Sequence, residues 1–484
     1  MTLWTREAAE AATGGRATGD FAAGGVSIDT RTLAPGDLFV AIRDARDGHA
    51  FVADAFAKGA AAALVSRVPE GETGPCLVVE DTLAGLEALA AAARARTGAK
   101  VVAITGSVGK TGTKEMLRAA FAAQGPTHAS AASYNNWVGV PLTLARMPAG
   151  TRWAAIEIGM NHAGEIRPLT KLTRPDAAII TTVESVHLEN FRDETGIAFA
   201  KAEILEGLGP AGVAVLNRDN RHHDRLARRA RRLGLRDIRR FGTGRRCDAR
   251  LIEARVTPAG TTVTARFRGE RMIWRIGAPG RHMAMNALAV LLALDAVGAD
   301  PVRGAMALAG WRAPAGRGAR WRVALGPDGV DGVIRLIDES YNANPTSVRA
   351  ALEVLAAAPV EDGVGRVGRG RRIAILGDML ELGPEERALH AALAEAPEMR
   401  VADKVHVCGP RMKALHEALA PERRGIWAED SAALAAQLRR LLDAGDAVMV
   451  KGSLGARMAR VVEAVTALGD ARPEDAPANG EEDG

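Results

Sequence analysis

The run ITGSVGKTGTKE at residues 104–115 decides the fold that the sequence predicts. The apolar run VVAIT at 101–105 leads into its glycines, and TKEMLRAAFAAQ at 113–124 follows with helical spacing of apolar residues. A buried strand, a glycine-rich turn and a helix in this order form a phosphate-binding loop, or P-loop, of an α/β domain. The turn is shorter than the common GxxxxGKS/T form, so we interpret it as a variant P-loop.

The residues of this turn have physical reasons to lie beside phosphates. Glycines let backbone N–H groups approach the oxygens, Lys110 adds a positive charge, and the following helix directs the positive end of its dipole at the anion. The hydroxyl of Thr111 suits a magnesium ion that bridges the terminal phosphates. We therefore predict a site for ATP and Mg²⁺ formed by Gly106, Ser107, Val108, Gly109, Lys110, Thr111 and Gly112.

Apolar runs on both sides of the P-loop predict the domain organisation. WAAIEIG at 153–159, AAIITTV at 177–183 and GVAVLN at 212–217 alternate with helical stretches, which is typical of a mostly parallel sheet between layers of helices. Similar runs at 333–453 predict a doubly wound, Rossmann-like domain, and shorter ones near the start predict a small α/β domain. The predicted division of this α/β protein is 1–97, 98–312 and 313–467, followed by a disordered acidic tail at 468–484.

Composition and charge narrow the class of protein. The 484 residues are too many for one ordinary core and fit about three domains. The formal net charge of +5 is too small and too dispersed to imply a nucleic-acid binder, and we interpret the arginine-rich run at 221–240 as a solvated helix face.

The cysteines and the apolar runs indicate where the protein works. The three cysteines match neither a zinc spacing nor a disulfide framework, which favours a reducing compartment. The first residues do not have the pattern of a signal peptide, and no later stretch supplies about 18 uninterrupted apolar residues. We expect a cytoplasmic, monomeric protein that has no membrane span and binds no nucleic acid.

Two polar residues fall at the predicted carboxyl edge of the central sheet. Glu157 ends a strand-like run, where its carboxylate could bind magnesium beside the phosphates. His187 follows the next run, where an imidazole could reach a second metal, although a histidine in such a place is usually structural. A P-loop with these neighbours still leaves kinase, ATPase, GTPase and ligase open.

Further motifs resemble those of the Mur ligases, a family of ATP-dependent ligases in peptidoglycan synthesis. The motifs that occur with the P-loop in that family's order are NNWVGVP at 135–141, EIGMNHAGEI at 157–166, VHLENF at 186–191, FAKAEI at 199–204 and GRHMAMNAL at 280–288. Within the family, the chain resembles the type that adds a terminal D-alanyl-D-alanine dipeptide. The runs that carry this likeness are SIDTRTLAPGDLFVAI at 27–42, DGHAFV at 47–52, DESYNANPTS at 338–347, LGDMLELG at 376–383 and VKGS at 450–453.

The resemblance implies an activity as well as a fold. The γ-phosphate of ATP would pass to the terminal carboxylate of a UDP-N-acetylmuramoyl-tripeptide, because a carboxylate is a poor electrophile until it is activated. The amine of D-alanyl-D-alanine would then displace phosphate from this acyl phosphate. The sequence contains no DNPR motif of the kind that a neighbouring family type uses to bind a free amino acid. The first implied domain binds the uridine nucleotide and the second binds ATP. The third closes over ATP and completes the ligase.

The resemblance also assigns roles to single residues. Lys110, Glu157, His187 and Lys201 are the implied catalytic residues, with Thr111 and Glu157 on a first magnesium ion and His187 on a second. Lys201 matches a lysine that is carbamylated in this family and then binds the second metal ion as an anion. The residues that match the nucleotide side are Asn286, Arg317, Asp338, Tyr341 and Asn342. Those that match substrate-binding positions are Ser27, Asp29, Thr30, Arg31, Asp47, Gly48, His49, Asn135, Asn136 and Asn344.

Three positions depart from the family pattern, and two alternatives remain. Met283 stands where the family usually has Asn, and Thr182 and Glu184 stand where Asn and Gly are usual. A ligase like folylpolyglutamate synthetase has a related architecture, and a regulatory P-loop NTPase would use the domains to transmit a conformational signal. The sequence leaves open whether the third residue of the tripeptide is diaminopimelate or lysine.

Overall fold

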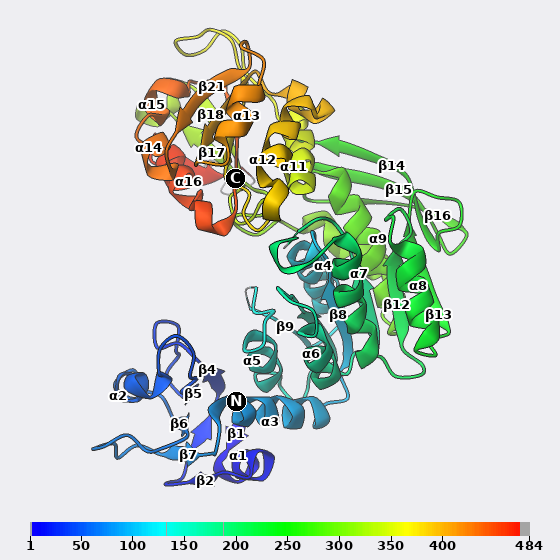
Figure 1. Cartoon of the computed structure of the whole chain (residues 1–484), viewed down its shortest axis with the longest axis vertical. Helices are drawn as coiled ribbons and strands as arrows, with labels where there is room; N and C mark the ends of the chain where they lie inside the picture. Colours follow the sequence, from blue (N-terminus) through cyan, green and yellow to red (C-terminus); the bar gives the residue numbers. More distant parts are fainter. Residues whose placement is uncertain (1, 132, 187, 475–484) are drawn as a thin grey trace, which may run out of the picture.

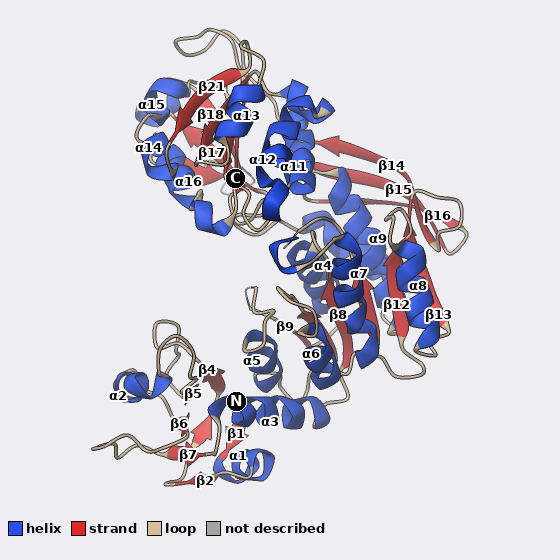
Figure 2. Cartoon of the chain, in the orientation of Figure 1, coloured by secondary structure: helices blue, strands red, loops and turns tan. Residues whose placement is uncertain are grey.

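The computed structural model describes residues 2–131, 133–186 and 188–474, and it contains three α/β units (Figure 1). The central unit lies between the N-terminal and C-terminal units, and each unit combines a main sheet with packed helices (Figure 2). This architecture confirms the predicted α/β fold class. Within the described residues, no helix is long and apolar enough to cross a membrane.

The central unit is built on a nine-stranded sheet in the order β16-β15-β14-β13-β12-β11-β8-β10-β9. The strands from β9 to β14 in this order pair in parallel, whereas β14, β15 and β16 form antiparallel hairpins that the sequence interpretation did not predict. The strands are β8 Lys100–Thr105, β9 Thr127–Ala129, β10 Trp153–Glu157, β11 Ala177–Ile180, β12 Val213–Asn217, β13 Asp237–Gly242, β14 Ala249–Thr257, β15 Gly260–Phe267 and β16 Glu270–Ile276. The helices are α4 Lys110–Ala122, α5 Gly139–Ala145, α6 Ile166–Thr173, α7 Glu194–Ala202, α8 His223–Arg232, α9 Arg281–Ala296 and α10 Pro301–Ala307.

Alternate residues of the central strands enter two separate cores. On β8, Val101 and Ala103 pack with helices α5 to α8, whereas Val102 and Ile104 pack with α4 and α9. All four are fully buried, because successive side chains of a strand point to opposite faces of the sheet and helices cover both faces here. This burial fixes β8 in the middle of the sheet and therefore fixes the P-loop that follows it.

The N-terminal unit shares one of these cores with the central unit. Its sheet has the order β2-β7-β6-β5-β4, and its helix α3 packs against α5 and α6 of the central unit. The indole of Trp4 donates a hydrogen bond to the carbonyl of Ala145 at 3.0 Å, and the Arg96 guanidinium lies 4.2 Å above the same ring. The elements are α1 Arg6–Thr13, β2 Arg16–Ala17, β4 Gly25–Ser27, β5 Asp37–Val40, α2 Val52–Ala57, β6 Ala62–Val65, β7 Cys76–Val78 and α3 Thr82–Ala95, with a short ribbon of β1 Trp4–Thr5 and β3 Ala22–Ala23.

The C-terminal unit has a seven-stranded sheet in the order β21-β20-β19-β22-β18-β17-β23. The strands from β21 to β18 pair in parallel, and β17 and β23 complete the edge in antiparallel pairing. Separate cores on its two faces contain α11 to α13 on one side and α14 to α16 on the other. The strands are β17 Ala319–Ala324, β18 Val333–Glu339, β19 Arg372–Gly377, β20 Lys404–Cys408, β21 Arg424–Ala428, β22 Ala447–Lys451 and β23 Asp470–Pro473. The helices are α11 Pro345–Ala357, α12 Glu386–Ala392, α13 Lys413–Ala418, α14 Ser431–Ala435, α15 Leu438–Leu441 and α16 Ala459–Thr466.

The prediction of a disordered tail from residue 468 is wrong for its first part. Strand β23 pairs with the edge strand β17, and the carboxylate of Glu474 lies 3.2 Å from the Arg320 guanidinium and 3.6 Å from that of Arg335. The open edge of β17 offers backbone hydrogen bonds that the polar composition of the tail does not reveal. The rest of the predicted tail, 475–484, lies outside the described residues.

We predict that a chain ending at Leu468 unfolds at a lower temperature than the full-length protein. It lacks β23 and the carboxylate that pairs with Arg320 and Arg335, so the loss should be about 1–3 kcal/mol of unfolding free energy. A chain ending at Glu474 is the matched control and should unfold at the full-length temperature. Equal midpoints for all three chains in thermal unfolding would contradict this role of β23.

Candidate functional site

The P-loop connects β8 to α4 at the carboxyl edge of the central sheet, and its backbone requires glycine. Gly106 has a φ of 152° and Gly109 a φ of 86°, a region that residues with a Cβ atom rarely adopt. A Cβ atom on Gly106 would lie 1.9 Å from the Thr181 hydroxyl oxygen, and one on Gly109 would lie 3.0 Å from the Asn286 amide. The loop is therefore held tightly between β11 and α9, as a backbone that curls around phosphates must be.

Lys110 begins α4 and turns its ammonium back into the loop. Its Nζ atom donates a hydrogen bond to the Gly106 carbonyl at 2.8 Å. Burial lowers the pKa of Lys110, the Glu157 carboxylate raises it, and the Arg317 guanidinium lowers it. The P-loop lysine thus lies near both a carboxylate and a second cation, which is an arrangement that suits a polyphosphate.

Glu157 ends β10 beside the P-loop, and its carboxylate is buried. Only 1% of the residue is exposed, one carboxylate oxygen accepts a hydrogen bond from the Thr111 hydroxyl at 2.9 Å, and the other accepts one from the Asn135 amide at 2.7 Å. A carboxylate and a hydroxyl are the hard oxygen ligands that Mg²⁺ prefers. Among the described residues, no three His, Cys, Asp or Glu side chains form a metal-binding cluster. Phosphate oxygens would therefore have to complete the coordination, as is common for Mg²⁺.

Lys201 lies on α7 and is buried, with 2% of the residue exposed. Burial and then the nearby Lys110 ammonium lower the pKa of Lys201 well below its ordinary value. Across the described ranges, the structure records no hydrogen bond or ion pair for this amine. Both effects shift the amine toward its uncharged form, which is the nucleophilic form. His187, the other predicted ligand of a second metal ion, lies outside the described residues.

A cavity of about 420 Å³ extends from the P-loop to the C-terminal unit. Arg317 reaches into it from the C-terminal unit, where its guanidinium donates a hydrogen bond to the Ser133 hydroxyl at 3.0 Å and lies 3.9 Å above the Tyr341 ring. A planar cation stacked on an aromatic ring is well suited to hold a phosphate or a base. The predicted site residues that line this cavity are Ser107, Val108, Gly109, Lys110, Thr111, Gly112, Asn135, Glu157, Asn286, Arg317, Tyr341, Asn342 and Asn344.

Two predicted ligand-binding residues, Asp338 and Asn136, are hydrogen-bonded to groups of the protein. Asp338 does not line the cavity, because its carboxylate accepts hydrogen bonds from the Gly316 amide and from the amide and hydroxyl of Ser340. It therefore holds the turn on which Arg317 is placed. Asn136 likewise accepts a hydrogen bond from the amide of Gly139 at the start of α5. Both side chains support the cavity from outside its lining.

The predicted uridine-nucleotide residues lie in two loops that follow neighbouring parallel strands, β4 and β5. In the first loop, Asp29 pairs with Arg31, and the hydrogen bond from that guanidinium lowers the pKa of Asp29 to about 2. Ser27, which donates to the carbonyl of Asp29, and Thr30 are buried beside this pair. The carboxyl ends of parallel strands share one edge of a sheet, so the second loop lies at the same edge.

The second loop fixes the tautomer of a buried histidine. The His49 Nε2 atom accepts a hydrogen bond from the Ser66 amide at 2.9 Å, so its Nδ1 atom carries the proton and donates to Asp47 at 2.6 Å. A Cβ atom on Gly48 would lie 2.6 Å from the Ile42 carbonyl, which requires glycine there. Neither loop lines the cavity at the P-loop, so these residues form a separate polar region.

Several cavity residues were not predicted. Lys451 ends β22, and its ammonium lies 3.3 Å from the Glu339 carboxylate at the end of β18 and donates to the Asn342 carbonyl at 2.9 Å. His282 lies on α9 with a buried Nδ1 atom that has no hydrogen-bond partner in the described part of the chain. The sequence signal for Lys451 and Glu339 was their position at the ends of strand-like runs. The cavity lining also includes Ser133, Thr181, Thr182, Glu184 and Thr346, which were not predicted as site residues.

Family models match two parts of the chain. A model of the Mur ligase middle domain matches residues 104–294, and a model of the Mur ligase, glutamate ligase domain, matches residues 325–454. The first match covers the P-loop, β10 and α7, and the second covers most of the C-terminal sheet.

Known proteins are similar over most of the chain. It is 38% identical to the UDP-N-acetylmuramoyl-tripeptide--D-alanyl-D-alanine ligase of Escherichia coli (strain K12), with 91% of this chain and 93% of that protein covered. A crystal structure of MurF from Acinetobacter baumannii has a TM-score of 0.80 and 28% identity, and covers 96% of this chain and 99% of its own. The structure of MurF ligase from Thermotoga maritima in complex with ADP has a TM-score of 0.73 and 24% identity, with 92% and 97% covered.

These likenesses and the P-loop site define the protein as an ATP-dependent ligase. The chain belongs to the Mur ligase family. This membership confirms the resemblance that the sequence motifs indicated.

We predict that Gly106→Ala lowers nucleotide affinity at least tenfold, because the added Cβ atom would collide with Thr181 and the backbone φ would be strained. Calorimetric titration with ADP and Mg²⁺ measures this. Gly98→Ala is the matched control, since nothing lies within 4 Å of the place that its Cβ atom would take and its φ is ordinary. Unchanged ADP affinity in Gly106→Ala would show that the loop does not bind phosphates.

Proposed function

We propose that this enzyme joins D-alanyl-D-alanine to a UDP-N-acetylmuramoyl-tripeptide and uses ATP to activate the peptide carboxylate. The observation that carries the proposal is the buried Glu157 carboxylate, bound by Thr111 directly beside the P-loop. The named activity of the Escherichia coli relative supports the choice of substrates. The ADP complex of the Thermotoga maritima relative supports an adenine nucleotide as the cofactor.

Activation of the carboxylate requires two anions to approach one another. Lys110 and Arg317 place positive charge on two sides of the cavity, where they would offset the negative charge that gathers during phosphoryl transfer. Asn286, Tyr341 and Asn342 line the part of the cavity that would hold the rest of the nucleotide. The enzyme would thus act by orienting the substrates and neutralising their charge, which is how phosphoryl-transfer sites generally work.

Magnesium would supply Lewis-acid stabilisation of the transferred phosphoryl group. Thr111 and Glu157 suit a first ion, because their oxygen atoms are buried side by side next to the P-loop lysine. We propose His187 and a carbamylated Lys201 for a second ion. The role of His187 in this pair rests on the sequence resemblance alone.

The environment of Lys201 supports its carbamylation. An uncharged lysine amine can attack carbon dioxide, forming a bond from nitrogen to carbon and releasing a proton, so the side chain gains a negative charge. The lowered pKa supplies the uncharged amine, and the Lys110 ammonium that disfavours a second cation would favour this anion. A group that is costly as a buried cation would then be stabilised as an anion between positive charges.

The three α/β units would divide the substrates among them. We propose that residues 1–97 bind the uridine nucleotide through Ser27, Asp29, Thr30, Arg31, Asp47, Gly48 and His49, residues 98–312 bind ATP, and residues 313–467 close over it. Asn135 and Asn344 would face the peptide side. Asn136 would contribute to the same side by holding the start of α5. We further propose a cytoplasmic monomer, and the free thiols of Cys76, Cys247 and Cys408 agree with a reducing compartment.

We predict that phosphate release depends on both the UDP-linked tripeptide and D-alanyl-D-alanine, and that Lys110→Ala lowers kcat at least a hundredfold. The ammonium that offsets the transferred charge is lost in this variant. A phosphate-release assay with each substrate omitted in turn measures the dependence, with Lys100→Ala, an exposed residue at the other end of β8, as control. Release that needs neither substrate would favour an NTPase, and release driven by a folate and glutamate would favour the folylpolyglutamate alternative.

We predict that Lys201→Ala nearly eliminates ligation and that a small carboxylic acid added to the medium partly restores it. The acid would replace the anion of the carbamate in the space left by the side chain. Lys201→Arg should not recover, because guanidinium cannot be carbamylated and keeps a positive charge. A wild-type enzyme that is fully active with bicarbonate excluded and carries an unmodified amine by mass spectrometry would contradict carbamylation.

A further inference from the structure

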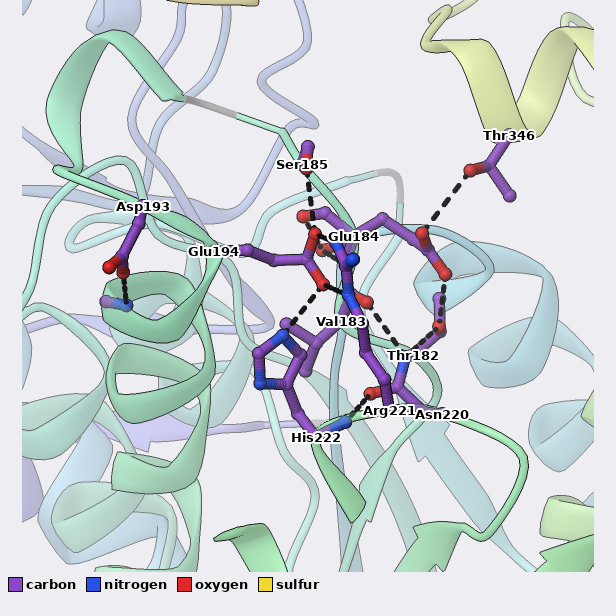
Figure 3. Close-up of polar contacts among 12 residues, drawn as sticks. Thr182, Val183, Glu184, Ser185, Asp193, Glu194, Asn220, Arg221, His222 and Thr346 are labelled. Carbon is purple, nitrogen blue, oxygen red and sulfur yellow. Dashed lines mark hydrogen bonds and ion pairs between the residues drawn. The ribbon is translucent and has the colours of Figure 1, made fainter.

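The loop at 182–185, between β11 and η2 (Leu188–Asn190), is a rigid platform beside the P-loop. From behind it, the buried Asn220 amide donates hydrogen bonds to the Thr182 hydroxyl at 3.0 Å and to the Val183 carbonyl at 2.8 Å. Ser185 donates to Glu194, the first residue of α7, at 2.8 Å. Figure 3 shows these contacts and the ion pair of Glu194 with Arg221. The backbone of the loop is therefore fixed to α7 and to the turn before α8.

The same loop is bonded to the P-loop through the main chain. The Ser107 hydroxyl accepts a hydrogen bond from the Glu184 amide at 2.9 Å and donates one to the Glu184 carbonyl at 3.0 Å. The Ser107 amide donates to the Thr182 carbonyl at 2.8 Å. These contacts use only the backbone of Glu184, so its side chain is available for other contacts. A substitution of that side chain can therefore retain the hydrogen bonds with Ser107.

The Glu184 side chain crosses to the C-terminal unit. One carboxylate oxygen accepts a hydrogen bond from the Thr182 hydroxyl at 2.9 Å, and the other lies 3.5 Å from the hydroxyl of Thr346 (Figure 3). Thr346 follows Pro345 in the first turn of the thirteen-residue helix α11. The positive end of a helix dipole favours a carboxylate at this position.

Two contacts between the central and C-terminal units are made by residues that line the cavity. Glu184 and Thr346 line the cavity, as do Ser133 and Arg317, which form a second hydrogen bond between the two units. Away from the cavity lining, the Arg320 guanidinium donates another to the Pro258 carbonyl. The contact between Glu184 and Thr346 is at the outer limit of a hydrogen bond, so a small approach of α11 would strengthen it. The contact is thus sensitive to how closely the C-terminal unit approaches the P-loop.

We propose that Glu184 is a positioning residue for nucleotide-dependent closure, and that its carboxylate holds the first turn of α11 against the loop that supports the P-loop. A nucleotide that draws the C-terminal unit toward the P-loop would bring α11 to the platform, and the platform would then hold α11 through Thr346. The cavity wall formed by Arg317 and Asn344 would be brought to the nucleotide by the same movement. Coupling of this kind needs a bond between two units whose distance changes, and Glu184 provides it.

The experiment is a double-mutant cycle on the full-length protein, with binding of a non-hydrolysable ATP analogue and Mg²⁺ measured by calorimetry. Thr346→Val removes the hydroxyl on an exposed helix turn, and Glu184→Ala removes the carboxylate but keeps the main-chain contacts with Ser107. We expect Thr346→Val to weaken binding about threefold to tenfold, as the loss of one hydrogen bond would. The same substitution should have no further effect in the Glu184→Ala background.

Three further measurements separate a positioning role from a structural one. Both single variants should raise the KM for ATP with kcat retained at saturating nucleotide, and both should increase the radius of gyration of the nucleotide-bound protein in X-ray scattering. Their unfolding temperature without nucleotide should match the wild type. Glu184→Gln, which keeps an acceptor oxygen, should lie between the wild type and Glu184→Ala in affinity.

Arg349→Gln is the matched control, because Arg349 also lies on α11 but its ion pair with Glu398 stays within the C-terminal unit. It should leave affinity and compaction unchanged. The proposal is overturned if Thr346→Val has no effect, if its effect is equally large in the Glu184→Ala background, or if Arg349→Gln weakens binding as much. Analogue binding and scattering need neither the UDP-linked tripeptide nor D-alanyl-D-alanine, so they can fail independently of the proposed ligase function, on which only the kinetic measurement rests.

Discussion

The parallel pairing of β8 between β10 and β11 is the constraint on which the rest of the site depends. It brings the ends of three strands to one edge, so that the P-loop after β8 lies between Glu157 at the end of β10 and Thr181 directly after β11. Parallel strands are buried on both faces, and the two apolar cores on either side of β8 hold this order in place. The chemistry at the edge can be polar because the position of each strand is already fixed by apolar contacts below it.

Ionisable groups are concentrated at this edge at some cost to stability. Glu157 and Lys201 are buried and Lys110 is partly buried, and burial lowers the pKa of both lysines. Glu157 has the hydroxyl of Thr111 and the amide of Asn135, whereas Lys201 lies near a like charge. Such an arrangement is best explained by ligands that bring compensating charge, namely phosphates and divalent cations. The desolvation of these ionisable groups at the site is tolerated because the sheet beneath them is well packed.

The two outer units are attached to the central unit in different ways. The N-terminal unit shares an apolar core with it, and Trp4 is anchored on the helix α5. The C-terminal unit has two cores of its own, and hydrogen bonds such as those of Arg317 and Thr346 join it to the cavity walls. A shared core resists relative movement, whereas a polar contact can lengthen and shorten with small changes in free energy. This difference makes the C-terminal unit the part suited to closing over a nucleotide.

The sequence by itself determined the α/β class, the P-loop and the place of Glu157, because each depends on residues that are close together in the chain. The pattern of strand, glycine turn and helix at 101–124 is local, and so is the position of a carboxylate at a strand end. The predicted roles of Lys201 and of the loops after β4 and β5 came from resemblance to a family, since no spacing rule indicates them. Their burial and hydrogen bonds became visible only in the folded chain.

Only the tertiary structure decided which polar groups are hydrogen-bonded within the protein and which line the cavity. The position of Asp338 at a strand end predicted a ligand-binding role, and the structure adds that its carboxylate accepts a hydrogen bond from the Gly316 amide, 22 positions earlier. Strand β23 has a polar composition, and it is ordered because β17 offers an open edge. Glu184 meets Thr346 across 162 positions of sequence. Such contacts depend on how separate sheets pack against one another, and neighbouring residues in the chain carry no record of that packing.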